Sequence, residues 1–190
     1  MVERIYLTGF MTSGKSTIGP ILANVLGWNF YDLDKVIEGK HEKSVVEIFE
    51  EFGEEYFRNY ETETLEKLST EKDTIISLGG GTLTSERNLA ILKQTGKIVY
   101  LRITAETIYH RLKHKIDRPL IRDLVLNERP REEFIERINK ILDERKYYCN
   151  PRARKVETTL LICGPVRPRL HTQPRFRTQE SYQVILLWQG

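Results

Sequence analysis

The stretch GFMTSGKST, residues 9–17, decides the fold of this chain. It fits the pattern G-x-x-x-x-G-K-[ST], follows a short apolar run that ends at Leu7, and precedes apolar residues at helical spacing from Ile18 to Leu26. Its two glycines allow the backbone to wrap an anion closely, while N–H groups at the start of a helix point toward that anion. The sequence therefore predicts a strand, a phosphate-binding loop and a helix that hold a nucleotide triphosphate.

Three side chains at the end of this loop carry its chemistry. Lys15 is placed to reach the β- and γ-phosphates as a point charge, and the Ser16 hydroxyl is placed to bind Mg²⁺. Thr17 adds a second hydroxyl, which is expected to contact the helix start. A plain glycine turn with a surface lysine is the alternative. The expected nucleotide-binding set is Thr12, Ser13, Gly14, Lys15, Ser16 and Thr17.

Composition limits the class of protein. The chain has 190 residues, 30% of them charged, and its net charge of +3 does not indicate nucleic-acid binding. No run approaches the roughly 18 apolar residues of a membrane span, and no signal segment precedes the first strand. Cys149 and Cys163 lack metal-ligand spacing, which favours a reducing compartment. We expect a cytoplasmic, monomeric protein without membrane contact.

Residues 28–34 read as a second short strand that ends in two carboxylates, Asp32 and Asp34. On an extended chain these two share one face at the carboxyl end of the strand, where open α/β sheets place their ligands. A triphosphate site needs one carboxylate near its metal and another group to orient the nucleophile. Alternatively, Asp34 only caps the helix that follows.

Arg58 stands out in the helical segment 35–69, in which Gly53 is the expected break between helices. Glu54 lies four residues before it and Glu61 three residues after it, so an ordinary ion pair on the helix surface is one interpretation. A role in binding the substrate is the other. Local sequence does not decide between them.

Three consecutive glycines, Gly79, Gly80 and Gly81, follow an expected strand over 74–78. Because glycine costs conformational entropy, three in a row indicate a backbone that must approach something closely. A flexible turn is the alternative.

The rest of the pattern alternates strands with helices. A strand is expected over 97–101, a helix from Thr104, and another helix around 134–142. Between the helices, an exposed segment over about 114–130 is long enough for an active-site lid. The alternation predicts an α/β protein: a three-layer fold like that of P-loop NTPases, with a central parallel sheet of about five strands, helices on both faces and a lid.

With these motifs in place, residues 1–148 resemble shikimate kinases. The order and spacing of the phosphate loop, the Asp-x-Asp pair, Arg58, the triple glycine and the Arg-Pro-Leu at 118–120 all agree with that family. Thr12 stands where the family usually has a smaller residue. The resemblance implies ATP-dependent phosphorylation of the 3-hydroxyl of shikimate in aromatic amino acid biosynthesis, with Mg²⁺ as cofactor.

The resemblance also implies roles for individual residues. Asp34 matches the aspartate that binds the substrate hydroxyls, and Asp32 matches the carboxylate that holds Mg²⁺ together with Ser16. Arg58 and Arg145 match two arginines on the substrate carboxylate. The matched catalytic residues are Asp34, Lys15 and Arg118. The glycines match a segment whose Gly80 N–H binds the substrate, Arg118 matches a lid arginine over the ATP phosphates, and Arg111 resembles an arginine beside the adenine.

After Tyr148 the chain departs from this family. Residues 155–162 can still form a strand, which places the kinase domain at 1–162, but residues 163–190 have no helical period. From Pro151 onward, seven Lys or Arg residues stand against two Glu. We expect a basic, disordered tail. A changed reading frame near residue 160 is one hypothesis, under which residues 184–188 would form an aggregation-prone end, and an RNA- or partner-binding extension is another.

Two other functions are compatible with the phosphate loop. A gluconate or nucleotide kinase shares the loop and the fold, but its acceptor does not require Asp34, Arg58, the glycines and Arg145 together. A nucleotide-dependent switch of another class requires an Asn-Lys-x-Asp motif, which the sequence lacks. A nucleic-acid motor requires an apolar strand that ends in an acidic residue, whereas the fourth strand ends in Leu101-Arg102.

Overall fold

The computed structural model describes residues 3–113, 123, 126–127, 129–146, 158–159 and 183–187, and their side chains except those of 144–146, 158–159 and 183–187. The expected lid arginine Arg118, both cysteines and most of the tail lie outside the described residues. Among the helices of the described part, none combines the length and the apolar composition that crossing a bilayer demands.

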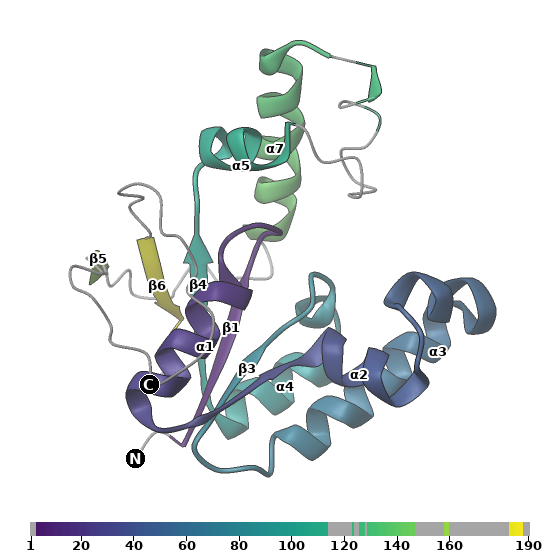
Figure 1. The fold of residues 1–190 in the computed structure, drawn as a ribbon, viewed down its shortest axis with the longest axis vertical. Helices are drawn as coiled ribbons and strands as arrows, with labels where there is room; N and C mark the ends of the chain where they lie inside the picture. The colour runs from purple at the N-terminus through teal and green to yellow at the C-terminus, as the bar shows by residue number, and fades with distance from the viewer. Residues whose placement is uncertain are drawn as a thin grey trace, which may run out of the picture.

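A central sheet contains four parallel strands in the order β2-β3-β1-β4 (Figure 1). They are β1 (Arg4–Gly9), β2 (Asn29–Asp32), β3 (Thr74–Ser77) and β4 (Lys97–Arg102). All four residues of β3 are buried, as expected for a parallel strand that helices cover on both faces. The predicted fold class is confirmed, although the parallel part has four strands where about five were expected.

The edge beyond β4 differs from the sequence expectation. β6 (Gln183–Leu187) pairs antiparallel with β4, and β5 (Thr158–Thr159) pairs antiparallel with β6. Five residues of the tail thus form a strand, so the expectation of disorder is wrong for 183–187. The physical reason is that an unpaired edge of β4 exposes backbone donors and acceptors, and an apolar segment of high β-propensity satisfies them.

The helices alternate with these strands. They are α1 (Lys15–Leu26), α2 (Leu33–His41), α3 (Val45–Leu68), α4 (Glu86–Thr95), α5 (Ala105–Leu112) and α7 (Arg131–Lys146), with a short 3₁₀ helix η1 (Thr82–Thr84). The predicted helix start at Thr104 is confirmed, because its side chain caps α5. Ser85 caps α4 in the same way, and Gly96 follows the last residue of α4. Gly53 interrupts α3 with φ 83°, at the predicted break.

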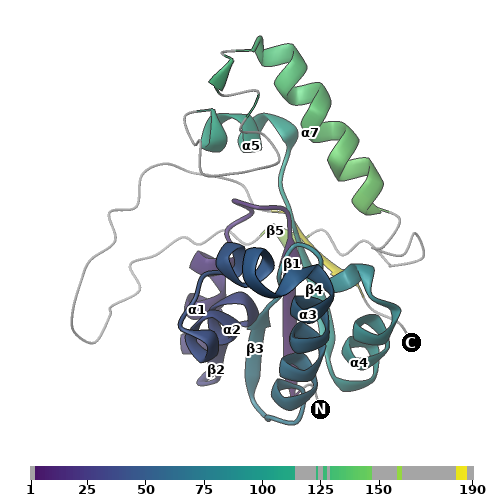
Figure 2. The same cartoon turned by 90° about the vertical axis from the view of Figure 1, so that its right-hand side faces the viewer.

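Side chains that alternate along the strands build two separate cores. Tyr6, Ile76 and Ile98 pack with residues of α2, α3 and α4, whereas Leu7 and Ile75 pack with residues of α1 on the opposite face. A third cluster joins α5 to α7 around Ile108, Phe134 and Ile138. Figure 2 shows α5 and α7 beyond one end of the sheet.

The connections place a binding site at the carboxyl ends of β1 and β3, which are neighbours in the sheet. The loop after β1 leads to α1 on one face, and the loop after β3 leads to α4 on the other face. Adjacent strands whose connections leave on opposite faces open a crevice between the two loops, and ligands of α/β proteins bind there. These loops are the phosphate loop and the triple glycine.

Candidate active site

The phosphate loop folds back on itself between β1 and α1. Gly9, Thr12 and Gly14 all have positive φ, at 150°, 62° and 95°, and the Ser13 N–H donates to the Phe10 carbonyl oxygen at 3.0 Å. A Cβ on Gly9 would lie 2.6 Å from Ser13 Oγ and 2.7 Å from the Leu101 carbonyl oxygen, so only glycine fits there. The loop is therefore a tight turn between β1 and α1, as predicted.

Two hydroxyl groups of this loop, Thr12 Oγ1 and Ser13 Oγ, are buried and have no hydrogen-bond partner among the described residues. Thr12 is also β-branched in the left-handed region, where such residues are strained. A buried polar group without a partner and a strained backbone are both costly, and both are typical of binding sites. The two hydroxyls are available to a bound anion.

Lys15 and Arg111 both contact the backbone of the loop. Lys15 Nζ donates to the carbonyl oxygens of Gly9 at 2.8 Å and Phe10 at 3.4 Å, which holds the ammonium group over the loop. Arg111 Nη1 donates to the Thr12 carbonyl oxygen at 2.5 Å, so α5 is tied to the phosphate loop across 99 positions of sequence. Both cations thus lie at the predicted nucleotide site.

Ser16 and Thr17 follow on the first turn of α1 with exposed side chains. Asp32 is the last residue of β2, and its Oδ1 accepts a hydrogen bond from the Lys35 N–H at 3.3 Å, which caps α2. A hydroxyl and a carboxylate are hard oxygen ligands of the kind that Mg²⁺ prefers, so these residue types fit the expected ion.

The predicted backbone position of Asp34 is wrong. Because Asp32 caps α2, the helix begins at Leu33, and Asp34 lies in its first turn instead of at the end of an extended strand. Asp34 also does not act as the cap. The helix turns its carboxylate toward β3, where a Cβ on Gly79 would lie 2.6 Å from Asp34 Oδ1. Asp34 therefore lies next to the glycine segment, but it reaches this position from α2 and not from the end of a strand.

The environment of Asp34 favours its neutral form. Burial, followed by the negative charges of Asp32 and Glu61, raises the pKa of the Asp34 carboxyl to about 6, although the ammonium of Lys15 acts in the opposite direction. A carboxylate with such a pKa is ionised at neutral pH and is a much stronger base than an ordinary aspartate. Lys15 of the phosphate loop is thus close enough to Asp34 to act on its ionisation.

Arg58 extends from α3 to the other end of the glycine segment. A Cβ on Gly81 would lie 2.6 Å from its Nη2, and its guanidinium lies 5.4 Å from the ring centroid of Phe57. It pairs with Glu54 at 3.2 Å and with Glu61 at 3.0 Å. Both ion pairs allowed by the sequence are therefore present, but Glu61 is only 1% exposed, so its pair with Arg58 is partly buried.

The glycine segment thus has a carboxylate near one end and a guanidinium near the other. Asp34 lies against Gly79 and Arg58 against Gly81, while Gly80 between them is exposed. The two groups thus lie at the two ends of the same three-residue segment.

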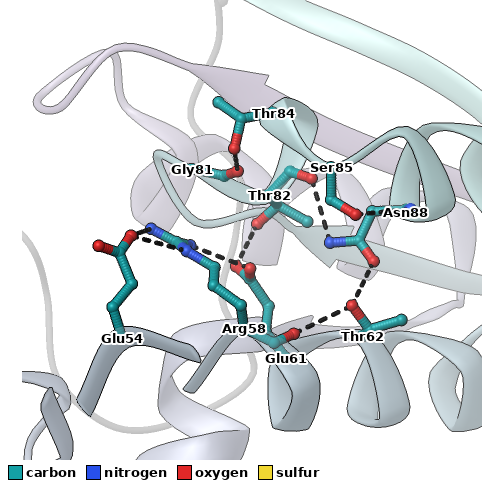
Figure 3. A network of polar contacts seen from close by, with 9 residues as sticks. All are labelled: Glu54, Arg58, Glu61, Thr62, Gly81, Thr82, Thr84, Ser85 and Asn88. Atoms are coloured by element: carbon teal, nitrogen blue, oxygen red, sulfur yellow. Dashed lines mark hydrogen bonds and ion pairs between the residues drawn. The ribbon is translucent and has the colours of Figure 1, made fainter. Parts of the chain in front are cut away.

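Two other predicted residues are not placed. Arg118 and most of the expected lid over 114–130 lie outside the described residues, and Arg145 belongs to α7 with its side chain outside the description. The sequence interpretation missed Thr62, Thr82 and Asn88, which are buried behind Arg58 (Figure 3). Ordinary polar residues far apart in the sequence offered no signal for their meeting.

A phosphate loop after the first strand of a parallel sheet, with a carboxylate and an arginine beside the loop after the neighbouring strand, is the arrangement of a P-loop phosphotransferase. The sequence profile of a family described as shikimate kinase matches residues 11–160. The chain therefore belongs to the shikimate kinase family, and it is a kinase.

Individual relatives agree with this assignment. The chain is 43% identical over 157 residues to the shikimate kinase of Chlorobaculum parvum, which covers 83% of this chain and 82% of that protein. It is 46% identical over 142 residues to the shikimate kinase of Chlorobium limicola, and the match covers 75% of this chain and 71% of that protein.

Two solved structures share the fold. A crystal structure of shikimate kinase from Bacteroides thetaiotaomicron matches with a TM-score of 0.67 and 33% identity, covering 78% of this chain and 82% of that one. Shikimate kinase from Acinetobacter baumannii in complex with shikimate matches with a TM-score of 0.65 and 34% identity, covering 78% of each chain.

Proposed function

We propose that this chain transfers the γ-phosphoryl group of ATP to the 3-hydroxyl of shikimate and releases ADP and shikimate 3-phosphate, a step of aromatic amino acid biosynthesis. The observation that carries this proposal is the placement of Asp34 and Arg58 against the two ends of the Gly79–Gly81 segment. Shikimate has a carboxylate on one side of its ring and hydroxyls on the other. Arg58 binds the carboxylate and Asp34 binds the hydroxyls, while the N–H of Gly80 donates a hydrogen bond to the substrate.

Asp34 acts on the attacking hydroxyl. Its carboxylate accepts the hydroxyl proton as the oxygen forms a bond to the γ-phosphorus and the bond between that phosphorus and the ADP oxygen breaks. The raised pKa of about 6 supports this role, because it brings the basicity of Asp34 closer to neutrality while leaving it ionised at pH 7. Enclosure in a low-dielectric site strengthens the contacts to the reacting groups.

The phosphate loop binds the nucleotide through residues 12–17, with Lys15 moving from its carbonyl partners onto the β- and γ-phosphates. The hydroxyls of Thr12 and Ser13 donate to phosphate oxygens, since burial leaves them no other described acceptor. Arg111, at the end of α5, lies beside the adenine. Positive charge at these positions offsets the negative charge that spreads over the transferred group.

Ser16 and Asp32 hold Mg²⁺, which supplies charge neutralisation at the phosphates when bound. Arg118 adds a further positive charge when the segment 114–130 closes, and Arg145 completes the clamp on the substrate carboxylate. We further propose a monomeric, cytoplasmic enzyme whose kinase domain spans 1–162, with 163–190 as an atypical basic tail.

Release of ADP, measured with a coupled assay for several acceptors, tests the proposal. We expect turnover with shikimate and none with gluconate or a nucleoside monophosphate, the acceptors of the related kinases. Asp34→Asn should abolish turnover nearly completely while leaving ATP affinity largely unchanged, and Asp73→Asn, at an exposed position just before β3, is the matched control. Full activity of Asp34→Asn, or a preference for another acceptor, would overturn the proposal.

A further inference from the structure

Arg58 and four residues behind it form a closed ring of hydrogen bonds that joins α3, η1 and α4 (Figure 3). Arg58 Nη1 donates to Oε2 of Glu61 at 3.0 Å, and Thr82 Oγ1 donates to Oε1 of the same carboxylate at 2.7 Å. Asn88 Nδ2 donates to the Thr82 carbonyl oxygen at 3.2 Å. The single hydrogen of the Thr62 hydroxyl is shared between Asn88 Oδ1 at 2.8 Å and the Arg58 carbonyl oxygen at 3.0 Å, which closes the ring.

This ring is almost entirely removed from water. Thr82 and Asn88 are fully buried, Glu61 is 1% exposed and Thr62 is 6% exposed, whereas the Arg58 side chain is one-third exposed. Buried polar groups rely on each other because water cannot replace a lost partner. Removal of one donor leaves its acceptor unpaired, and the neighbouring groups then reorient.

We propose that Thr82 and Asn88 are positioning residues that set the orientation of Arg58 through Glu61. The inference rests on the proposed binding of the substrate carboxylate by Arg58. Asn88 fixes the Thr82 backbone to α4, and Thr82 fixes one carboxylate oxygen of Glu61. The other oxygen of Glu61 then points at Arg58 and holds the guanidinium against Gly81, next to the segment that faces the substrate.

The competing partner of Arg58 explains why this support is needed. Glu54 lies 3.2 Å from Arg58 Nη2 and is 69% exposed, so it is free to draw the guanidinium toward solvent. A Glu61 carboxylate with both oxygens held opposes this movement. Without the Thr82 donor, one Glu61 oxygen is unpaired in the interior, and the carboxylate rotates away from the orientation that Arg58 needs.

Steady-state kinetics with two acceptors test the inference: shikimate, and an analogue in which a hydroxymethyl group replaces the carboxylate. The variants are Thr82→Val and Asn88→Leu, which keep the shape of each side chain and remove its polar atoms. We expect kcat/KM for shikimate to fall about tenfold, chiefly through KM, and kcat/KM for the uncharged analogue to change less than about twofold. Thr82→Ser, which retains the hydroxyl, should restore the wild-type ratio between the two acceptors.

Thr95→Val is the matched control. Thr95 Oγ1 makes two hydrogen bonds of 2.6 Å, to the Tyr6 hydroxyl and the Ile91 carbonyl oxygen, at the other end of α4. Its loss should lower stability by a similar amount and leave the acceptor ratio unchanged. An equal loss with both acceptors in Thr82→Val and Asn88→Leu would show a merely structural role and overturn the inference.

Arg58→Lys separates the inference from the proposed function. If it lowers the ratio of shikimate to analogue while Thr82→Val and Asn88→Leu do not, the positioning role is wrong and the proposed function stands. If Arg58→Lys also leaves the ratio unchanged, Arg58 does not bind the carboxylate and the proposed function fails at that point. If either ring variant does not fold, the other one carries the test.

Discussion

Arg58 occupies the space that a side chain at Gly81 would need, because a Cβ on Gly81 would lie 2.6 Å from Arg58 Nη2. The contact joins α3 to the loop after β3. It is the most direct link between an expected substrate-binding side chain and the glycine segment.

Gly81→Ala should therefore weaken shikimate binding without unfolding the protein. The obstructed atom is the end of a flexible side chain, so Arg58 moves and the backbone stays. We expect KM for shikimate to rise about tenfold or more, as for a lost charge-assisted hydrogen bond, with KM for ATP unchanged. Gly39→Ala, in open space on α2, is the control and should stabilise the protein by about 0.5–1 kcal/mol. Unchanged shikimate kinetics in Gly81→Ala would contradict the placement.

The activity of the enzyme should have an acid limb near pH 6. The ionised carboxylate of Asp34 is the base, and its pKa is raised to about 6 by burial and by the charges of Asp32 and Glu61. Because kcat/KM reports the free enzyme, it should fall about tenfold per pH unit below that value and stay level above it. Circular dichroism in the same buffers controls for unfolding. A limb near pH 4 would mean that Asp34 is an ordinary carboxyl or is not the base.

Asp34→Asn should make the folded protein more stable at neutral pH. A carboxyl whose pKa is raised by folding destabilises the native state where it is ionised, so its removal should gain about 1–3 kcal/mol at pH 7.5. As the pH falls through 6 toward 4, wild-type Asp34 takes up its proton in the native state and the gain disappears. Urea unfolding at pH 7.5 and pH 4 measures this, with the exposed Asp73→Asn as the control. A variant less stable than wild type at pH 7.5 would refute the proposed cost.

Thr12→Gly should stabilise the chain by about 1 kcal/mol, because it relieves a β-branched residue from a left-handed conformation and removes a buried hydroxyl without a described partner. Glu42→Gly, at a similar φ of 54° on the exposed end of α2, is the comparison and should gain less, since glutamate is not β-branched. Urea midpoints of the three proteins give the result. A loss of stability in Thr12→Gly would show that the hydroxyl has a stabilising contact.

Deletion of residues 163–190 should lower stability and increase self-association. The deletion removes β6 and leaves β4 as an unpaired edge, which is a template for pairing with another chain. We expect a lower Tm and light scattering that rises with protein concentration. If the tail serves only as a binding extension, Tm, scattering and turnover would all remain those of the full chain.

The phosphate loop was predictable from the sequence because its geometry is local. Gly9 and Gly14 must adopt positive φ, and Lys15 must start the helix, so the residue types themselves reveal the turn. The caps at Ser85 and Thr104 follow the same rule. Asp34 shows the limit of this approach: its importance was predicted, but the cap formed by Asp32 moved it from a strand into α2.

The position of Arg58 beside the glycine segment could be recognised only from the tertiary structure. Its spacing from Glu54 and Glu61 satisfied the rules for surface ion pairs, and helical periodicity could not show that Glu61 is buried under Thr82. The same holds for the tail, where composition suggested disorder but pairing with β4 gives 183–187 a partner.

By itself, the sequence determined the strand, loop and helix that bind phosphate, the alternation that makes a parallel sheet, and the set of charged residues available to the site. These follow from backbone preferences and from the spacing of neighbours along the chain. The tertiary structure alone decided that Asp34 lies against Gly79 and Arg58 against Gly81, and that Asn88 hydrogen-bonds to Thr62, 26 positions earlier. Such contacts arise when the two cores pack on the sheet, and no local pattern encodes them.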